Sequence, residues 1–317
     1  MTSDAFHVYD TTMRDGAQQE GLNLSVQDKL HVARHLDDLG VGFIEGGWPG
    51  SNPKDTEFFA LAAKELELRN ATLAAFGATR RAGLRAADDP LVAALRESGA
   101  PVVTLVAKSH DRHVELALRT TLEENLAMVR DTPSSTSGPR GSASSSTAST
   151  SSTATSRTAR TRWRSCGPPP RRGADVVVLC DTNGGMLPHQ VEEVVADTLS
   201  VGARLGIHAH NDTGCAVANS MAAVRAGATH LQGCLNGYGE RTGNADLVTS
   251  VANLELKLGM QVLPEGALAE ATRIAHAVSE ITNYPPSARQ PYTGVSSFAH
   301  KAGLHASAIR VDPDLYQ

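Results

Sequence analysis

Cysteine is scarce in this sequence. Only four cysteines occur among 317 residues, and none has the CxxC spacing of structural zinc sites or redox motifs. A small disulfide-stabilised fold is therefore excluded, because such folds need a dense framework of cysteines. We expect reduced thiols at Cys166, Cys180, Cys215 and Cys234.

Long apolar runs and an excess of basic charge are also missing. No apolar run approaches the roughly 20 residues that a membrane-spanning helix needs. The first residues, MTSDAFHVYDTT, have neither the basic start nor the apolar core of a secretory signal. The formal net charge is -5 and the pI is near 6.2, which gives no basis for nucleic-acid binding. We expect a cytoplasmic protein that binds neither membranes nor nucleic acid.

What the sequence does contain is a regular alternation of short apolar runs with stretches of helical periodicity. The apolar runs predict strands at 6–12, 41–47, 72–78, 101–108, 175–182, 204–211 and 230–237. The intervening stretches predict helices at 25–39, 55–68, 88–98, 115–130, 188–202, 214–226 and 245–258. Strands that are apolar throughout are typical of a parallel sheet covered by helices.

Repeated strand–helix units over this length favour a (β/α)8 barrel, which we place over residues 1–262. A doubly wound open sheet is the alternative, although no GxGxxG follows the first strand to support it. The polar clusters of the sequence follow its predicted strands, and this is where such barrels place their active sites.

The predicted barrel has only seven strands, and the gap falls where the fifth should be. Residues 132–172 are dominated by Ser and Thr, and no Asp or Glu occurs in them. The segment suggests disorder, with no strand between 101–108 and 175–182. A linker there would leave two open strand edges, so we favour a translational frameshift that disrupts the fifth strand–helix unit. A one-base change of frame allows codons for an apolar strand, an acidic cluster and an amphipathic helix.

Two histidines separated by one residue end the predicted strand 204–211. Residues i and i+2 of a strand point to the same face, so His208 and His210 direct two imidazoles toward one point. A carboxylate, Asp15, follows the first predicted strand. Two histidines and a carboxylate from separate strand ends indicate a divalent-metal site with open positions. Isolated histidines such as His230 are expected to be ordinary core or surface residues.

Six ordered motifs resemble those of the 2-isopropylmalate/homocitrate/citramalate synthase family. They are DTTMRDGAQQEG, FIEGGWPGSNPKD, CDTNGG, GIHAHNDTGCAVANS, LNGYGERTGNADL and FAHKAGLHASAI. The second motif resembles the citramalate-synthase branch. The resemblance implies a (β/α)8 barrel that condenses acetyl-CoA with a 2-keto acid, here pyruvate, with the help of a divalent metal.

The resemblance also implies roles for individual residues. The metal ligands would be Asp15, His208 and His210, with Asn244 as a fourth ligand or close neighbour. This donor set suits Mg2+, Mn2+ or Zn2+ without choosing among them. Arg14 would bind substrate and stabilise an alkoxide or enolate, and a salt bridge to a nearby carboxylate is the alternative.

Four further residues would complete the site. Thr182 would hydrogen-bond the keto-acid carboxylate, unless it is an ordinary strand-end residue. Glu45 and its neighbour Trp48 would line the pocket for the keto-acid side chain, where a bulky Trp suits a methyl group. His305 would be a base or proton relay that reaches the active site of the partner subunit, which implies a homodimer.

The sequence departs from the family pattern at two places, and it allows alternative functions. The family's acidic residue after the fifth strand is absent, and residues 263–317 look like the start of a truncated C-terminal subdomain. Alternative functions are 2-isopropylmalate or homocitrate synthesis, a metal-dependent lyase or aldolase on the same barrel, and an inactive product of a disrupted gene.

Overall fold

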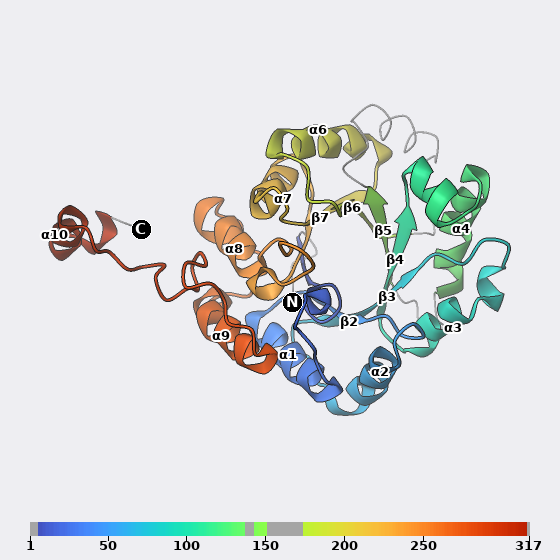
Figure 1. The fold of residues 1–317 in the computed structure, drawn as a ribbon, viewed down its shortest axis with the longest axis horizontal. Coiled ribbons are helices and arrows are strands. Elements are labelled where there is room, and N and C mark those ends of the chain that lie inside the picture. The colour runs from blue at the N-terminus through green and yellow to red at the C-terminus, as the bar shows by residue number, and fades with distance from the viewer. Residues whose placement is uncertain (1–5, 137–142, 151–173, 316–317) are drawn as a thin grey trace.

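Eight parallel strands close into a barrel in chain order in the computed structural model, which describes residues 6–136, 143–150 and 174–315 (Figure 1). The strands are β1 (His7–Asp10), β2 (Phe43–Gly47), β3 (Thr72–Ala78), β4 (Val102–Lys108), β5 (Ala143–Thr150), β6 (Val176–Asp181), β7 (Arg204–Ala209) and β8 (His230–Gly233). The closing pair is β1 with β8, where His7 is in register with His230. The predicted barrel and its seven predicted strands are confirmed.

Helices surround this barrel (Figure 1). They are α1 (Val26–Leu39), α2 (Pro53–Glu65), α3 (Pro90–Glu97), α4 (Leu122–Thr136), α6 (Pro188–Thr198), α7 (Ala216–Arg225), α8 (Leu247–Ala252) and α9 (Ala271–Thr282). Single-turn 3-10 helices span Gly16–Gln18, Ala86–Asp88, Leu199–Val201, Leu235–Gly237, Ala267–Glu270 and Pro313–Leu315, and π-helical turns span His113–Ala117 and Asn253–Lys257. No helix of the described residues is long and apolar enough to cross a membrane.

The first helix shows how local sequence sets these boundaries. Ser25 and Asp28 form a reciprocal capping box at the start of α1, which satisfies backbone N–H groups that have no partner within the helix. The helix ends at Leu39, and the following Gly40 has a φ of 85°, a left-handed conformation that suits glycine. The buried face of α1, including Leu30 and Leu36, packs into the main hydrophobic core.

The expectation that no strand would lie between β4 and β6 was wrong. β5 pairs with both neighbours in parallel, with Val102 opposite Ala143 and Val177 opposite Ser146. Sheet pairing uses backbone N–H and C=O groups, so a strand rich in Ser and Thr can satisfy two edges that would otherwise stay open. Residues 137–142 and 151–173 lie outside the described residues, and so does most of the segment for which we predicted disorder and a frameshift.

The segment after α9 leaves the barrel and ends in α10 (Gly303–Val311), which lies apart from the other elements (Figure 1). None of the residues of α10 is buried. Large apolar side chains in and around it are exposed, among them Phe298, Leu304 and Val311. We call residues 295–315 the C-terminal arm.

Candidate active site

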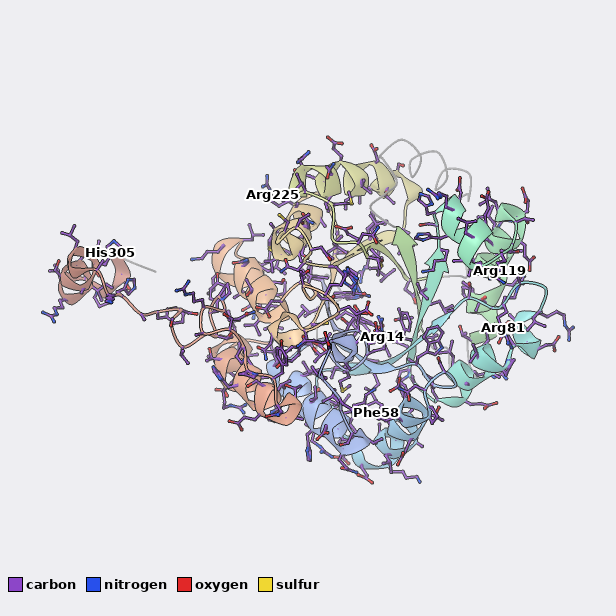
Figure 2. All side chains as sticks on the ribbon, viewed as in Figure 1. Arg14, Phe58, Arg81, Arg119, Arg225 and His305 are labelled. Atoms are coloured by element: carbon purple, nitrogen blue, oxygen red, sulfur yellow. The ribbon has the colours of Figure 1, made fainter. Side chains whose placement is uncertain are left out.

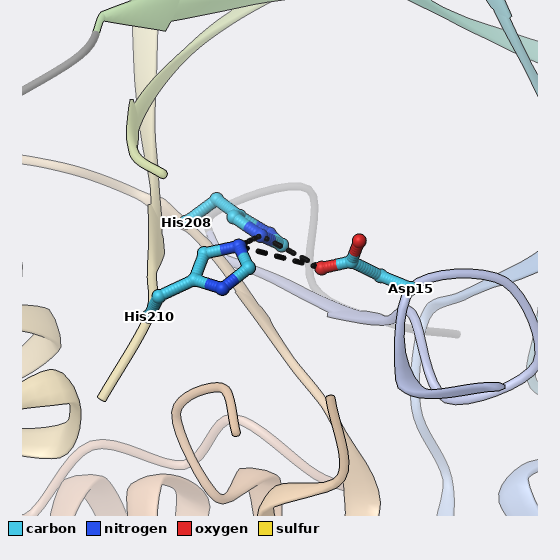
Figure 3. Close-up of side chains that lie close together, drawn as sticks. All are labelled: Asp15, His208 and His210. Carbon is cyan, nitrogen blue, oxygen red and sulfur yellow. Dashed lines mark hydrogen bonds and ion pairs between the residues drawn. The ribbon is translucent and has the colours of Figure 1, made fainter. Parts of the chain in front are cut away.

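Asp15, His208 and His210 converge in the structure (Figure 3). The Nε2 atoms of the two histidines lie 3.2 Å apart. Asp15 Oδ2 lies 3.2 Å from His208 Nε2 and 3.6 Å from His210 Nε2. All three residues are buried, and a single ion could contact one atom from each.

The barrel geometry creates this convergence. His208 lies at the end of β7 and His210 follows it, so the strand alternation points both rings the same way. Asp15 is held in a turn after β1, where its backbone N–H donates to the carbonyl of Thr11 at 2.9 Å. Because all strands are parallel, their carboxyl ends open at the same mouth of the barrel.

Asn244 lies beside the cluster. Its Nδ2 donates to Asp15 Oδ2 at 2.6 Å, while its buried Oδ1 has no hydrogen-bond partner among the described residues. The preceding Gly243 has a φ of 89°, and a Cβ there would lie 2.1 Å from the carbonyl oxygen of Gly237. A glycine is therefore required to bring Asn244 to this position.

The donor set fits a divalent cation. His208 Nδ1 lies 3.1 Å from Gln232 Oε1, an arrangement that places the ring proton on Nδ1 and leaves an Nε2 lone pair facing Asp15. Burial alone raises the pKa of Asp15, but Arg14 and the two histidines outweigh it and hold that pKa well below its usual range. Burial and the neighbouring His208 lower the pKa of His210 to about 4. An anionic carboxylate and neutral imidazoles are the forms that bind metal.

Arg14 is held rigidly next to the cluster. Its NH1 donates to Asp15 Oδ1 at 2.8 Å and its Nε donates to Glu45 Oε2 at 2.6 Å. The guanidinium carbon lies 3.8 Å from the centre of the Phe76 ring, a cation–π contact. Glu45 also accepts a hydrogen bond from the Tyr9 hydroxyl at 2.8 Å. The salt bridges expected as an alternative for Arg14 are therefore present, to Asp15 and to Glu45.

A buried ion pair shapes the loop that carries Trp48. Lys29 pairs with Asp55, and Lys29 Nζ also donates to the carbonyl of Gly46 at 2.9 Å. Asp55 Oδ2 accepts the backbone N–H of Trp48 at 2.8 Å. The Trp48 ring then lies edge-on to Phe76, with centroids 5.3 Å apart. Phe76 thus contacts both the Trp48 ring and the Arg14 guanidinium.

Thr182 directly follows β6 and is exposed. Its backbone carbonyl accepts a hydrogen bond from Arg241 NH2 at 2.8 Å. Arg241 also binds Asp212 in a bidentate manner, through Nε at 2.7 Å and NH2 at 2.8 Å. This clamp joins the loops after β6, β7 and β8, which carry Thr182, His210 and Asn244, while His208 lies in β7 itself.

His305 is far removed from these residues within one chain. It lies on α10, is exposed, and has the His300 ring as a neighbour at a centroid distance of 6.2 Å. Figure 2 shows His305 on the C-terminal arm, apart from Arg14 in the middle of the barrel. The structure therefore brings together all of the expected metal ligands but not the expected base.

Comparison with known proteins places this architecture. The HMGL-like family model matches residues 5–278. The chain belongs to the HMGL-like family. It is 65% identical over 99% of its length to an (R)-citramalate synthase of Streptomyces coelicolor and 44% identical over 99% to one of Aquifex aeolicus. It spans only 59% and 60% of the length of these two relatives. The resemblance to the citramalate-synthase branch is thus confirmed.

More distant relatives share the HMGL-like fold. A 2-isopropylmalate synthase of Sulfurisphaera tokodaii is 30% identical over the whole chain, which covers 79% of that protein. Among solved structures, an HMG-CoA lyase of Acinetobacter baumannii superposes with a TM-score of 0.71 at 18% identity, covering 95% of this chain and 100% of that one. At that identity the superposition shows the fold alone.

Sequence reasoning missed several residues of this HMGL-like site. Tyr9, Phe76 and Gln232 support Arg14 or His208 from other strands, and Lys29 and Asp55 fix the Trp48 loop. Lys29 offered a signal, since it is a charged residue on the buried face of α1. The other contacts depend on the closure of the barrel, which no local pattern encodes.

Proposed function

We propose that the protein condenses acetyl-CoA with pyruvate and water to give citramalate and free CoA. The observation that carries this proposal is the convergence of Asp15, His208 and His210 in a chain 65% identical to an (R)-citramalate synthase. The reaction forms a bond between the acetyl methyl carbon and the keto carbon of pyruvate. Hydrolysis of the thioester then releases CoA, so no oxidant or reductant is needed.

Asp15, His208 and His210 would hold a divalent ion, with the unpaired Oδ1 of Asn244 beside it. Such an ion, which could be Mg2+, Mn2+ or Zn2+, supplies a Lewis acid for the keto carbonyl. Arg14 would bind the keto acid and offset the negative charge that develops on its oxygen. Glu45 is 1% exposed and acts in this proposal by holding Arg14, instead of contacting the keto-acid side chain.

Three residues would select pyruvate. The Thr182 hydroxyl, at the mouth of the barrel after β6, would donate to the carboxylate of the keto acid. Trp48 and Phe76 form an aromatic wall next to Arg14. In this proposal the wall would admit a methyl group in preference to a branched chain. An apolar pocket discriminates by roughly 1–3 kcal/mol per methylene, so this wall could account for a preference.

A homodimer would supply the base or proton relay that the barrel of one chain lacks among the described residues near the metal site. His305 lies on an arm whose apolar residues are exposed, so a second copy that covered them could also receive His305 at its barrel mouth. The histidine would there remove a proton from the acetyl methyl group or relay it. Residues 1–262 would form the catalytic barrel and 263–317 the start of a further subdomain. We place the enzyme in the cytoplasm.

The alternative functions differ from this proposal in the substrate, in the reaction, or in whether the chain is active at all. A 2-isopropylmalate or homocitrate synthase would use the same chemistry on a larger keto acid, and a lyase or aldolase would cleave a carbon–carbon bond on the same barrel. The 65% identity to a citramalate synthase, against 30% to a 2-isopropylmalate synthase, favours the first proposal. A disrupted gene would give an inactive chain.

A thiol-release assay tests the proposal. Acetyl-CoA with pyruvate should release CoA far faster than acetyl-CoA with 2-ketoisovalerate, and chelation should abolish release in both cases. The assay should be run on the 317-residue chain and on a version with the frame of 132–172 restored and the C-terminus extended. We expect strong activity only from the second; a preference for 2-ketoisovalerate would refute the assigned substrate.

A further inference from the structure

A chain of polar side chains runs from His208 into the interior of the barrel. Gln232 Oε1 lies 3.1 Å from His208 Nδ1, and Gln232 Nε2 lies 3.2 Å from His230 Nε2. Gln232 stands opposite His208 in the register of β7 and β8, and His230 precedes it by two residues on the same strand face. Gln232 is 2% exposed and His230 is 1% exposed, so water does not replace these contacts.

The barrel is built to admit the His230 ring at this place. Gly206 stands opposite His230 on β7, and a Cβ at Gly206 would lie 2.7 Å from His230 Cδ2. Tyr9 and His7 pack against the same ring, with centroid distances of 5.3 and 5.7 Å. Among the described residues, only the Gln232 amide is a hydrogen-bond partner of the His230 side chain, whose Nδ1 has none.

The direction of the hydrogen bonds along this chain follows from the chemistry of its groups. A metal bound at His208 Nε2 requires the ring proton on Nδ1, and that N–H needs an acceptor. The Gln232 amide can present its oxygen to His208 only if its NH2 group finds an acceptor on the other side. His230 Nε2 is that acceptor when the ring is neutral, and burial lowers the pKa of His230 to about 3.

We infer that Gln232 and His230 are positioning residues, which orient one amide so that His208 keeps the tautomer that binds metal. The inference rests on the proposed metal site. His230 touches neither the ion nor the substrate in this account, and it acts through Gln232. Outer partners of metal-binding histidines typically change metal affinity by about 10-fold to 100-fold.

Titration calorimetry with Mn2+ tests the inference through affinity, independently of catalysis. Gln232→Leu should weaken Mn2+ binding by about 10-fold to 100-fold. His230→Phe should weaken it by roughly threefold to tenfold, since a smaller share of the protein then holds the binding-competent amide orientation. Thermal unfolding of each variant shows whether the barrel remains folded.

The decisive comparison uses Gln232→Glu as the matched variant. Its carboxylate accepts from His208 Nδ1 in either orientation, so His230→Phe should cost less than about twofold in that background. An equal loss in both backgrounds would show that His230 only fills space, and no loss in the unmodified protein would also overturn the inference. Failure of the unmodified protein to bind Mn2+ would instead refute the proposed metal site.

Nitrogen NMR on the unmodified Mg2+-loaded protein gives a second measurement that needs no variant. The ring proton of His230 should reside on Nδ1, with Nε2 unprotonated and accepting from Gln232. A proton on His230 Nε2 would reverse the amide and overturn the inference.

Discussion

Two of the pairs of neighbouring histidines in this molecule lie in opposite environments. His208 and His210 lie in the barrel with ring centroids 5.1 Å apart and are 6% and 5% exposed. His300 and His305 lie on the C-terminal arm with centroids 6.2 Å apart, near a Leu304 that is 83% exposed. The first pair meets its carboxylate within one chain, and the second lies on an arm that stands apart from the barrel (Figure 1).

The difference shows which parts of a site a single chain can complete. Strand alternation and parallel closure suffice to bring His208 and His210 to Asp15. The C-terminal arm is not part of this sheet. In our proposal, the surface that covers its exposed apolar side chains sets its position relative to a catalytic centre. If our proposal is correct, one active site combines a barrel pair from one subunit with an arm pair from the other.

The largest expected effect comes from the barrel pair. In the frame-restored and extended protein, which also serves for the activity comparisons below, His210→Ala removes one metal ligand. It should lower CoA release by about 1000-fold, equivalent to about 4 kcal/mol of lost transition-state stabilisation. The exposed His189→Ala on α6 is the control and should leave the rate unchanged. Retention of Mn2+ binding and activity in His210→Ala would contradict the proposed site.

The arm pair is expected to affect catalysis without affecting metal binding. His305→Ala should slow CoA release by about 100-fold or more, the range for loss of a general acid–base group, while the Mn2+ affinity stays constant. Calorimetry and the thiol assay on the same preparation separate the two effects.

Mixing the two inactive variants sharpens the comparison. A heterodimer of His210→Ala with His305→Ala contains one site with both groups intact if the arm acts across the dimer. Refolding the two together should therefore recover part of the activity, up to about a quarter in a random mixture of subunits. Absence of any recovery, with dimers present by light scattering, would place His305 in its own subunit or outside the mechanism.

The sequence predicted the features that depend on local patterns and missed those that depend on contacts between strands. The barrel, the site of Asp15 and the histidine pair depend on local periodicity, and the structure places them as expected. β5 was not predicted because its sequence, ASSSTAST, lacks an apolar run, whereas strand pairing depends on the backbone. Gln232 and Phe76 were missed because their partners lie on other strands, and no pattern within one segment contains that information.

A smaller effect is expected at the aromatic wall of the barrel. Trp48→Leu removes the ring that packs edge-on against Phe76 and should enlarge the space beside Arg14. The ratio of kcat/KM for 2-ketoisovalerate to that for pyruvate should rise at least about tenfold, within the 1–3 kcal/mol expected per methylene. The conservative Trp48→Phe is the control, and an unchanged ratio in Trp48→Leu would exclude this wall from substrate selection.

The smallest effect concerns the pH dependence of stability, which separates buried from exposed histidines. Burial lowers the pKa of His230 from 6.5 to about 3, and the neighbouring His7 and Arg204 act in the same direction. Between these two pH values the unfolded chain binds one more proton than the folded chain, so His230 makes the free energy of unfolding fall as the pH falls. Asp10 acts in the opposite sense, because burial raises its pKa from 3.8 to about 7.

The difference between the unmodified protein and His230→Phe isolates the histidine, since Asp10 is common to both. Lowering the pH from 6 to 5 should cost the unmodified protein about 1 kcal/mol more of unfolding free energy than the variant, approaching the 1.4 kcal/mol per pH unit of one proton. Urea unfolding of the metal-free proteins at both pH values measures this. Parallel losses in the two proteins would mean that His230 protonates without cost in the folded barrel, and the neutral ring required for the contact with Gln232 would then be untenable.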